Sequence, residues 1–63
     1  MDTNKLKIFM MEKNYTQKKL SEELGISIQS FNAKVNKHRQ FKLHEVIKII
    51  DILDIKDPVD IFL

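Results

Sequence analysis

Cysteine is absent from this 63-residue sequence, which also contains only one glycine and one proline. Without cysteine the chain can form neither a disulfide nor a thiolate metal site. The two histidines, His38 and His44, are too few for a structural zinc shell and are not spaced to share one helical face. We therefore expect no metal and no cofactor, and a fold held together by apolar packing.

Long hydrophobic runs are missing as well. The longest apolar stretches have two to four residues, whereas a transmembrane helix needs about 20, and no apolar run of signal-peptide length is present. Hydrophobic residues make up 43% and charged residues 32% of the chain, a balance typical of globular domains. These features predict a single domain, residues 1–63, in the cytoplasm, and the missing cysteine fits that reducing compartment.

The basic charge is concentrated in one part of the chain. Residues 1–43 contain nine Lys or Arg and four Asp or Glu, whereas residues 44–63 contain two and five. Between Ile26 and Leu43 there are four basic residues and no acid. Such a stretch suits a polyanion, although charge alone is equally compatible with an ordinary solvated surface.

Capping residues and apolar spacing predict five helices, at about residues 2–13, 17–24, 28–36, 43–53 and 58–62. Asn14 and Gly25 can take the left-handed conformation that ends a helix. The predicted N-caps are polar residues just before each helix: Asp2 or Thr3, Thr16, Ser27 and Asp57, the last followed by Pro58.

The predicted fourth helix, residues 43–53, is the most apolar. Its expected buried stripe consists of Leu43, Val46, Ile47, Ile50 and Leu53. Ile49 and Ile52 widen this stripe beyond a single face. Together with Ile61, Phe62 and Leu63 they are either additional core or the surface of a weak homodimer.

The third predicted helix carries the main functional signal. Gly25 ends the helix before it, Ser27 caps it, and Phe31 and Val35 form its apolar side at i, i+4 spacing. Two helices joined by a short turn with a glycine, the second polar on its outer side, have the sequence form of a helix-turn-helix. In the basic loop that follows, residues 37–42, Phe41 is expected to turn inward as an anchor.

The run TQKKLSEELGISIQSF resembles the helix-turn-helix of the lambdoid phage repressor and Cro family, also called the XRE family. The similarity covers nearly the whole chain: LHEVIKIIDILDI resembles the family's fourth helix, and FNAKVNK with the basic loop is similar to short proteins of Gram-positive phages and prophages. This resemblance implies an all-α, compact, five-helix, lambda-repressor-like domain that binds double-stranded DNA in a bacterial cell or a phage-infected host.

Five positions depart from the family pattern. Ser21 stands where alanine is usual, and Asp54 replaces the glycine that usually follows the fourth helix. Ile50 and Ile52 stand where alanine is common, so packing there is bulkier. Lys34 stands where the family is often apolar, and Val35, one residue later, can take that core role. One residue turns an α-helix by about 100°, so this last departure bears on which side chains face the DNA.

A major groove admits one helix, and the side chains near its N-terminus reach the base edges. The amides of Gln29 and Asn32 can each form a two-point pair with adenine. Apolar side chains can contact a thymine methyl, and a serine can contact a base or a phosphate. The predicted base contacts are Ile28, Gln29, Ser30, Asn32 and Ala33.

Phosphate contacts are expected around this helix. The resemblance implies such contacts by Gln17 and Asn36, and helix termini favour them. The cations of the basic loop suit flanking phosphates, although Arg39 can alternatively enter the minor groove. The predicted phosphate contacts are Gln17, Ser27, Lys34, Asn36, Lys37, Arg39 and Lys42.

Two functions from different classes remain. The first is a sequence-specific transcriptional regulator, a Cro-like repressor, that occupies a palindromic operator as a weak homodimer formed or strengthened on DNA. The second is a protein-interaction module on the same scaffold, such as an antirepressor or a phage antagonist of a host protein. The second is favoured if Ile8, Met11 and Tyr15 form a continuous apolar patch. No enzyme is expected, because no glycine-rich nucleophile elbow accompanies the serines, and neither a membrane nor a small-molecule substrate is expected as a partner.

Overall fold

The computed structural model describes residues 1–62, which contain helices and no strands. The helices are α1 (Thr3–Glu12), α2 (Gln17–Leu24), α3 (Ile28–Val35), α4 (Leu43–Ile52) and α5 (Val59–Phe62). The all-α class is confirmed, with the first four helices within about one residue of their predicted bounds. The five-helix prediction is matched only in part, because α5 is a single turn of four residues beside helices of eight to ten.

Short polar side chains begin the first three helices, as predicted. The Asp2 carboxylate accepts hydrogen bonds from the backbone N–H groups of Asn4 and Lys5, at 3.0 and 3.2 Å. The hydroxyls of Thr16 and Ser27 each accept from the N–H three residues later, at 3.1 Å. Each cap supplies a partner for an N–H that has none within its helix, a contribution of about 1 kcal/mol.

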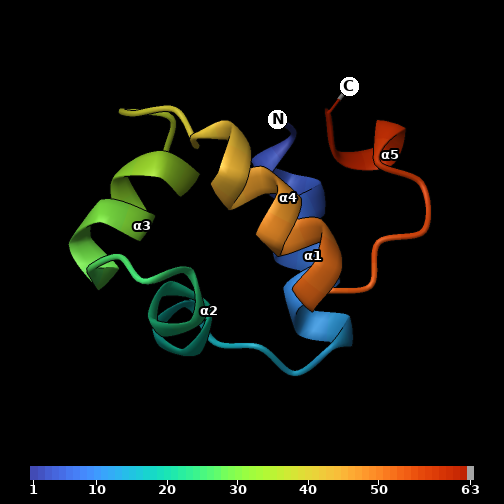
Figure 1. Cartoon of the computed structure of the whole chain (residues 1–63), viewed down its shortest axis with the longest axis horizontal. Helices are drawn as coiled ribbons and strands as arrows, with labels where there is room; N and C mark the ends of the chain where they lie inside the picture. The colour runs from blue at the N-terminus through green and yellow to red at the C-terminus, as the bar shows by residue number, and fades with distance from the viewer. Residues whose placement is uncertain (63) are drawn as a thin grey trace.

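Figure 1 shows how the helices are arranged. α2 and α3 lie side by side, α1 and α4 cross near the middle of the view, and α5 returns to the start of the chain. α2 packs against both α3 and α4, and α1 packs against α5. A hydrogen bond from the Asp2 N–H to the Ile61 carbonyl, 2.7 Å, joins the two ends of the domain.

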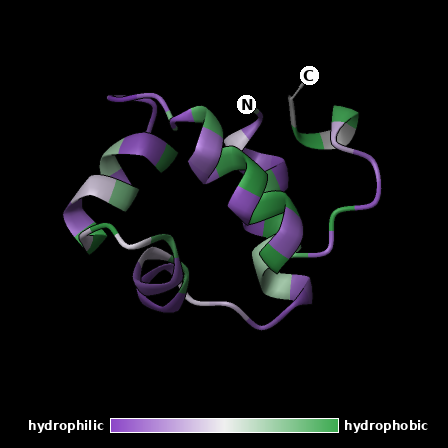
Figure 2. Ribbon diagram, viewed as in Figure 1, coloured by the Kyte–Doolittle hydropathy of each residue, from purple (hydrophilic) through white to green (hydrophobic). Residues whose placement is uncertain are grey.

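One hydrophobic core fills the space between the helices. The pairs Leu20 with Leu24 and Phe31 with Val35 point inward, as their i, i+4 spacing predicted. In Figure 2 most of the segment between α3 and α4 is hydrophilic. Within this segment, Phe41 is half-buried and packs against the core. Within residues 1–62 no helix is both long and apolar enough to span a bilayer.

The predicted stripe of α4 was wrong in part. Leu43 and Ile47 are 71% and 57% exposed, whereas Val46, Ile49 and Leu53 are buried. The helix is therefore rotated so that a stripe with i, i+3, i+7 spacing faces the core. Isoleucines stand on several sides of α4, so apolar spacing alone is compatible with either rotation.

This rotation also corrects the predicted dimer surface. Ile49 and Ile61 are both fully buried in the core, and Ile52 is half-buried and packs against it. Fully buried residues are unavailable to a second copy of the chain, so Ile49 and Ile61 do not form an exposed interface. The side chains of Phe62 and Leu63, the remaining members of that prediction, lie outside the described residues.

Candidate nucleic-acid interface

The turn between α2 and α3 begins at Gly25, which has φ 75° and ψ 28°. This left-handed conformation lets the N–H of Gly25 bond to the Glu22 carbonyl and the N–H of Ile26 to the Ser21 carbonyl, both at 3.1 Å. Ser21 is buried, and its hydroxyl donates to the Lys18 carbonyl at 2.7 Å. The small serine therefore fits the position beside the turn where the family usually has alanine.

Replacing Gly25 with alanine is expected to lower the free energy of unfolding by about 1–2 kcal/mol. No atom lies within 4 Å of an added Cβ, so the cost comes from the left-handed backbone and not from a clash. Asp54, at φ 52°, is the matched control, because Asp54→Gly should raise stability by up to about 1 kcal/mol. Urea unfolding of both variants measures these changes in the free energy of unfolding. If both variants change stability equally and in the same direction, the backbone explanation is excluded.

The side of α3 that faces away from the core carries all five predicted base-contacting residues. Ile28 is 40% exposed, and Gln29 is exposed as well. The other three, Ser30, Asn32 and Ala33, are half-buried. α3 therefore presents two amides and small side chains to a ligand, with Phe31, Lys34 and Val35 on its opposite, buried side.

The basic loop, residues 37–42, folds back against α3. Lys37 takes a left-handed conformation with φ 65°, and the N–H groups of His38 and Arg39 both reach the Ala33 carbonyl, at 2.8 and 3.3 Å. The Arg39 guanidinium donates to the Ser30 hydroxyl at 3.2 Å. These contacts hold loop cations beside the outward face of α3.

The predicted phosphate residues other than Lys34 remain available to a ligand. Gln17 is half-buried at the start of α2. The others, Ser27, Asn36, Lys37, Arg39 and Lys42, are exposed. Their contacts with phosphate stay predictions.

Lys34 is a correction. Its side chain is only 3% exposed, and its ammonium donates to both carboxylate oxygens of Glu45 at 2.7 Å. The prediction of a phosphate contact by Lys34 was therefore wrong. Val35 is in the core as expected, but Lys34 is inside too, because Glu45 supplies the negative charge that a buried ammonium requires.

Glu45 is the residue that sequence reasoning missed. It lies in the first turn of α4 and is 1% exposed, and its Oε1 also accepts from the backbone N–H of Lys42 at 2.7 Å. Among the described residues, no buried side-chain nitrogen or oxygen lacks a hydrogen-bond partner. A single acid in the first turn of the apolar fourth helix, three residues after Lys42, was the available signal.

The pKa of Glu45 is lowered overall. Burial by itself raises the pKa of this carboxyl, but the hydrogen bonds from the Lys34 ammonium and the Lys42 N–H, with the nearby positive charge, favour the carboxylate more strongly. Protonation therefore favours the unfolded chain. The contribution of this group to stability is complete above the usual glutamate pKa of 4.5 and is lost as the pH falls through the lower folded value.

We accordingly expect acid to destabilise the protein through Glu45. The free energy of unfolding in urea should fall steadily below about pH 5, where the unfolded chain begins to bind the additional proton. The double variant Lys34→Met/Glu45→Leu lacks this group and should show a shallower decline. An equal decline in both proteins would assign the acid sensitivity to the other carboxylates.

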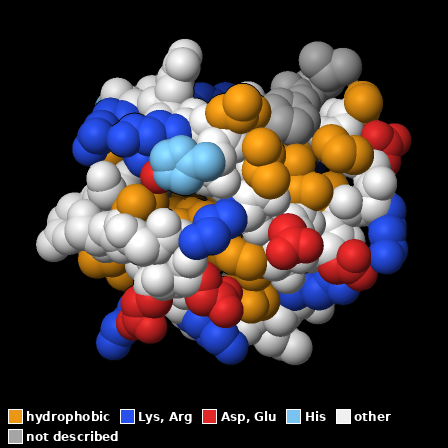
Figure 3. Space-filling view, viewed as in Figure 1, with side chains coloured by type: hydrophobic (Ala, Val, Ile, Leu, Met, Phe, Trp, Pro, Cys, Tyr) orange, Lys and Arg blue, Asp and Glu red, His pale blue; other side chains and the backbone are white. Residues whose placement is uncertain are grey.

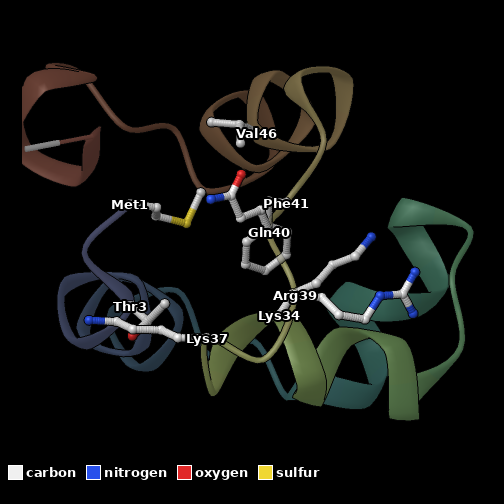
Figure 4. A pocket seen from close by; sticks show the side chains of 8 residues that line it. All are labelled: Met1, Thr3, Lys34, Lys37, Arg39, Gln40, Phe41 and Val46. Atoms are coloured by element: carbon white, nitrogen blue, oxygen red, sulfur yellow. The ribbon is translucent and has the colours of Figure 1, made fainter.

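A hollow of about 440 Å³ lies beside the basic loop. Its lining comes from the N-terminus, α3, the loop and α4: Met1, Thr3, Lys34, Lys37, Arg39, Gln40, Phe41 and Val46. In Figure 4 the Phe41 ring lies near the centre, with Lys34 and Arg39 on one side of it and Lys37 on the other. Phe41 also packs edge-on against Phe31, with ring centroids 5.8 Å apart, so it is the inward anchor that its place in the loop predicted.

The basic loop beside α3 differs in charge from the rest of the face drawn in Figure 3. In Figure 3 basic side chains gather over the segment that joins α3 to α4, and acidic side chains are spread over the lower part and the right side of the view. Elsewhere in that view basic atoms lie close to acidic ones. Within residues 1–62, no group of three or more His, Asp or Glu residues is placed to hold a metal ion.

Two helices joined through a left-handed glycine, the second with an outward polar face beside a basic loop, define a helix-turn-helix domain. The model of the Cro/C1-type helix-turn-helix DNA-binding domain matches residues 5–62. The chain therefore belongs to this family and is a DNA-binding domain. No curated protein and no solved structure gives a significant match to it.

Proposed function

We propose that this protein is a sequence-specific transcriptional regulator, a Cro-like repressor, that reads the major groove of double-stranded DNA with α3. It acts by binding and excluding other proteins from an operator, without enzymatic activity. The observation that carries the proposal is the hydrogen bond from Arg39 to Ser30, which sets a phosphate-seeking cation beside the base-reading face. One approach to DNA can therefore engage bases and phosphates together.

The base-reading role falls to the N-terminal half of α3. Gln29 and Asn32 can each form a two-point pair with adenine, and Ile28 and Ala33 can contact thymine methyl groups. Ser30 already accepts a hydrogen bond from Arg39, so its hydroxyl proton is free to donate to a base or a phosphate. The start of α2, the two caps of α3 and the basic loop then follow the phosphate backbone, at Gln17, Ser27, Asn36, Lys37, Arg39 and Lys42.

Gln29→Ala and Lys37→Ala should separate the two kinds of contact. Loss of the amide should change which operator bases matter and remove roughly 1–3 kcal/mol of discrimination at one position. Loss of the ammonium should weaken binding to all sequences alike and lower the salt slope by about one. Gel shifts on a panel of duplexes measure both, and equal losses on every duplex for Gln29→Ala would remove this residue from base reading.

The operator is proposed to be palindromic and bound by two copies, because half-sites one helical turn apart, about 34 Å, match a two-fold pair of such domains. The proposed homodimer is weak and forms, or is strengthened, on DNA. Sedimentation with and without the duplex measures this, and strict one-to-one binding would contradict it. Since its ligand is DNA, the regulator is placed in the cytoplasm of a bacterium or a phage-infected host.

The alternative is a protein-interaction module, an antirepressor or antagonist of a host protein. The observation that favours it is the exposure of two apolar side chains on α1, Ile8 at 55% and Met11 at 76%. Such a module would not need DNA. A pure protein that ignores duplex DNA at low ionic strength but loses a protein partner on Ile8→Ser/Met11→Ser would establish this alternative.

The direct test of the proposed function is selection of bound duplexes from random-sequence DNA. We expect a recovered consensus with two-fold symmetry, which would define specificity and stoichiometry together. Recovery of unrelated sequences, with affinity that depends only on salt, would contradict a sequence-specific regulator.

A further inference from the structure

We infer that Glu45 is a positioning residue for DNA binding, because its buried carboxylate fixes the two ends of the phosphate-seeking loop, residues 37–42, relative to the base-reading helix. The inference rests on the proposed function and assigns a role to a residue that faces no ligand. Glu45 is 1% exposed, so it cannot touch DNA itself. Its effect must pass through the groups that it binds.

The first of these groups is Lys34, in the last turn of α3. Its ammonium lies 2.7 Å from both oxygens of Glu45, which joins α3 to the first turn of α4 across the loop. Two short hydrogen bonds from one charged donor, shielded from water, hold this end far more firmly than an exposed ion pair would. The residue three positions before the loop is thereby fixed to the residue three positions after it.

The second group is the backbone N–H of Lys42, the last residue of the loop. It donates to the same Oε1 of Glu45 at 2.7 Å. This bond begins α4 and also fixes the peptide from which the Lys42 side chain extends to solvent. One carboxylate therefore sets both where the loop leaves α3 and where it enters α4.

The loop has other attachments, and they define what Glu45 adds. Arg39 is tied to Ser30, and Phe41 packs on Phe31. Both attachments are made to α3. At the α4 end, the Lys42 carbonyl accepts from the backbone N–H groups of Glu45 and Val46 at 3.0 Å, and the Glu45 carboxylate alone holds the Lys42 N–H. Releasing that N–H should therefore loosen the loop at its α4 end while the other contacts persist, and ordering it again on DNA would cost about tenfold in affinity.

A matched pair of variants isolates this bond. Lys34→Met/Glu45→Leu removes both charges and every acceptor for the Lys42 N–H, while Lys34→Met/Glu45→Gln keeps an amide oxygen at that place. Both changes leave the net charge unaltered. The control Lys56→Gln/Asp54→Asn breaks the exposed ion pair of 3.1 Å. It also removes one positive and one negative charge, and it should bind DNA like the unaltered protein.

The experiment measures affinity for the selected duplex and for a mixed-sequence duplex across a salt series, at a temperature where unfolding curves show every variant folded. The leucine double variant should bind both duplexes about tenfold more weakly, with an unchanged salt slope, because the loop makes the same phosphate contacts once it is ordered on DNA. The glutamine double variant should recover most of this loss. Equal loss on both duplexes is expected, because the loop contacts phosphates and not bases.

Each other outcome is decisive. If the unaltered protein binds neither duplex, the proposed function fails. If it binds and the folded leucine variant binds equally well, the function stands and the positioning role is overturned. Weakening on the selected duplex alone, or no recovery with glutamine, would also overturn it. If the glutamine variant does not fold, comparison of the leucine variant with the unaltered protein decides.

Discussion

Replacing Glu45 alone with leucine should remove a large part of the protein's stability at neutral pH. The change leaves the Lys34 ammonium buried without a counter-charge, and breaking a buried pair in this way costs about 3–5 kcal/mol. A domain of this length has roughly 3–9 kcal/mol of total stability. Urea unfolding followed by circular dichroism at 25 °C should therefore show a midpoint far below that of the unaltered protein.

The double variant Lys34→Met/Glu45→Leu is the control for this effect. It removes both charges together and fills the space with apolar side chains, a change that is often neutral or stabilising for a buried pair. We expect unfolding free energy within about 1–2 kcal/mol of the unaltered protein, or above it. A double variant as unstable as Glu45→Leu would show that the pair contributes through packing that leucine and methionine cannot replace.

Phe31→Ala should have the second large effect, a loss of about 3–5 kcal/mol. Phe31 is fully buried between the helices, and its ring also receives the edge of Phe41 at 5.8 Å. Truncation leaves a cavity and releases the loop anchor at the same time. The midpoint temperature of thermal unfolding should fall substantially. In the protein that remains folded, the backbone amides of residues 37–42 should exchange their hydrogens with solvent faster.

Phe31→Leu is the matched comparison, because it keeps apolar volume but removes the aromatic partner. It should cost less stability than alanine and still loosen the loop, since an edge-on aromatic pair contributes about 0.5–1.5 kcal/mol. Loss of stability without any change in loop exchange would show that Phe41 is held by other contacts.

The helix-turn-helix was predictable because its signals are local. Gly25 needs a left-handed conformation, Ser27 caps the following helix, and Phe31 with Val35 marks one helical face. Each of these depends on residues within a few positions of one another. The structure places the same residues as expected, and the match over residues 5–62 gives the same family.

The burial of Lys34 was not predictable from local spacing. Its partner is 11 residues away on another helix, and a lysine in a basic stretch is ordinarily a surface cation. The two charges come together only in the folded domain, where α3 and α4 both pack against α2. Lys34 therefore occupies a core position that the family often fills with an apolar residue.

The rotation of α4 was also decided by tertiary packing. Leu43 and Ile47 fit an amphipathic stripe as well as Ile49 does, but Ile49 alone of these three is in the core. Because several isoleucines stand on different sides of this helix, its hydrophobic pattern is compatible with more than one rotation about the helix axis. The contacts of α4 with α2 and the core select one, and they withdraw Ile49 from any dimer surface.

The outward face of α3 and the basic loop are together proposed to bind duplex DNA. A titration of ¹⁵N-labelled protein with a duplex at low ionic strength, followed through the backbone amide resonances, tests this proposal. The largest chemical-shift changes are expected at residues 27–33 and 37–42, and added salt should reverse them. Unchanged resonances, or changes centred on Ile8 and Met11 of α1, would exclude this binding face.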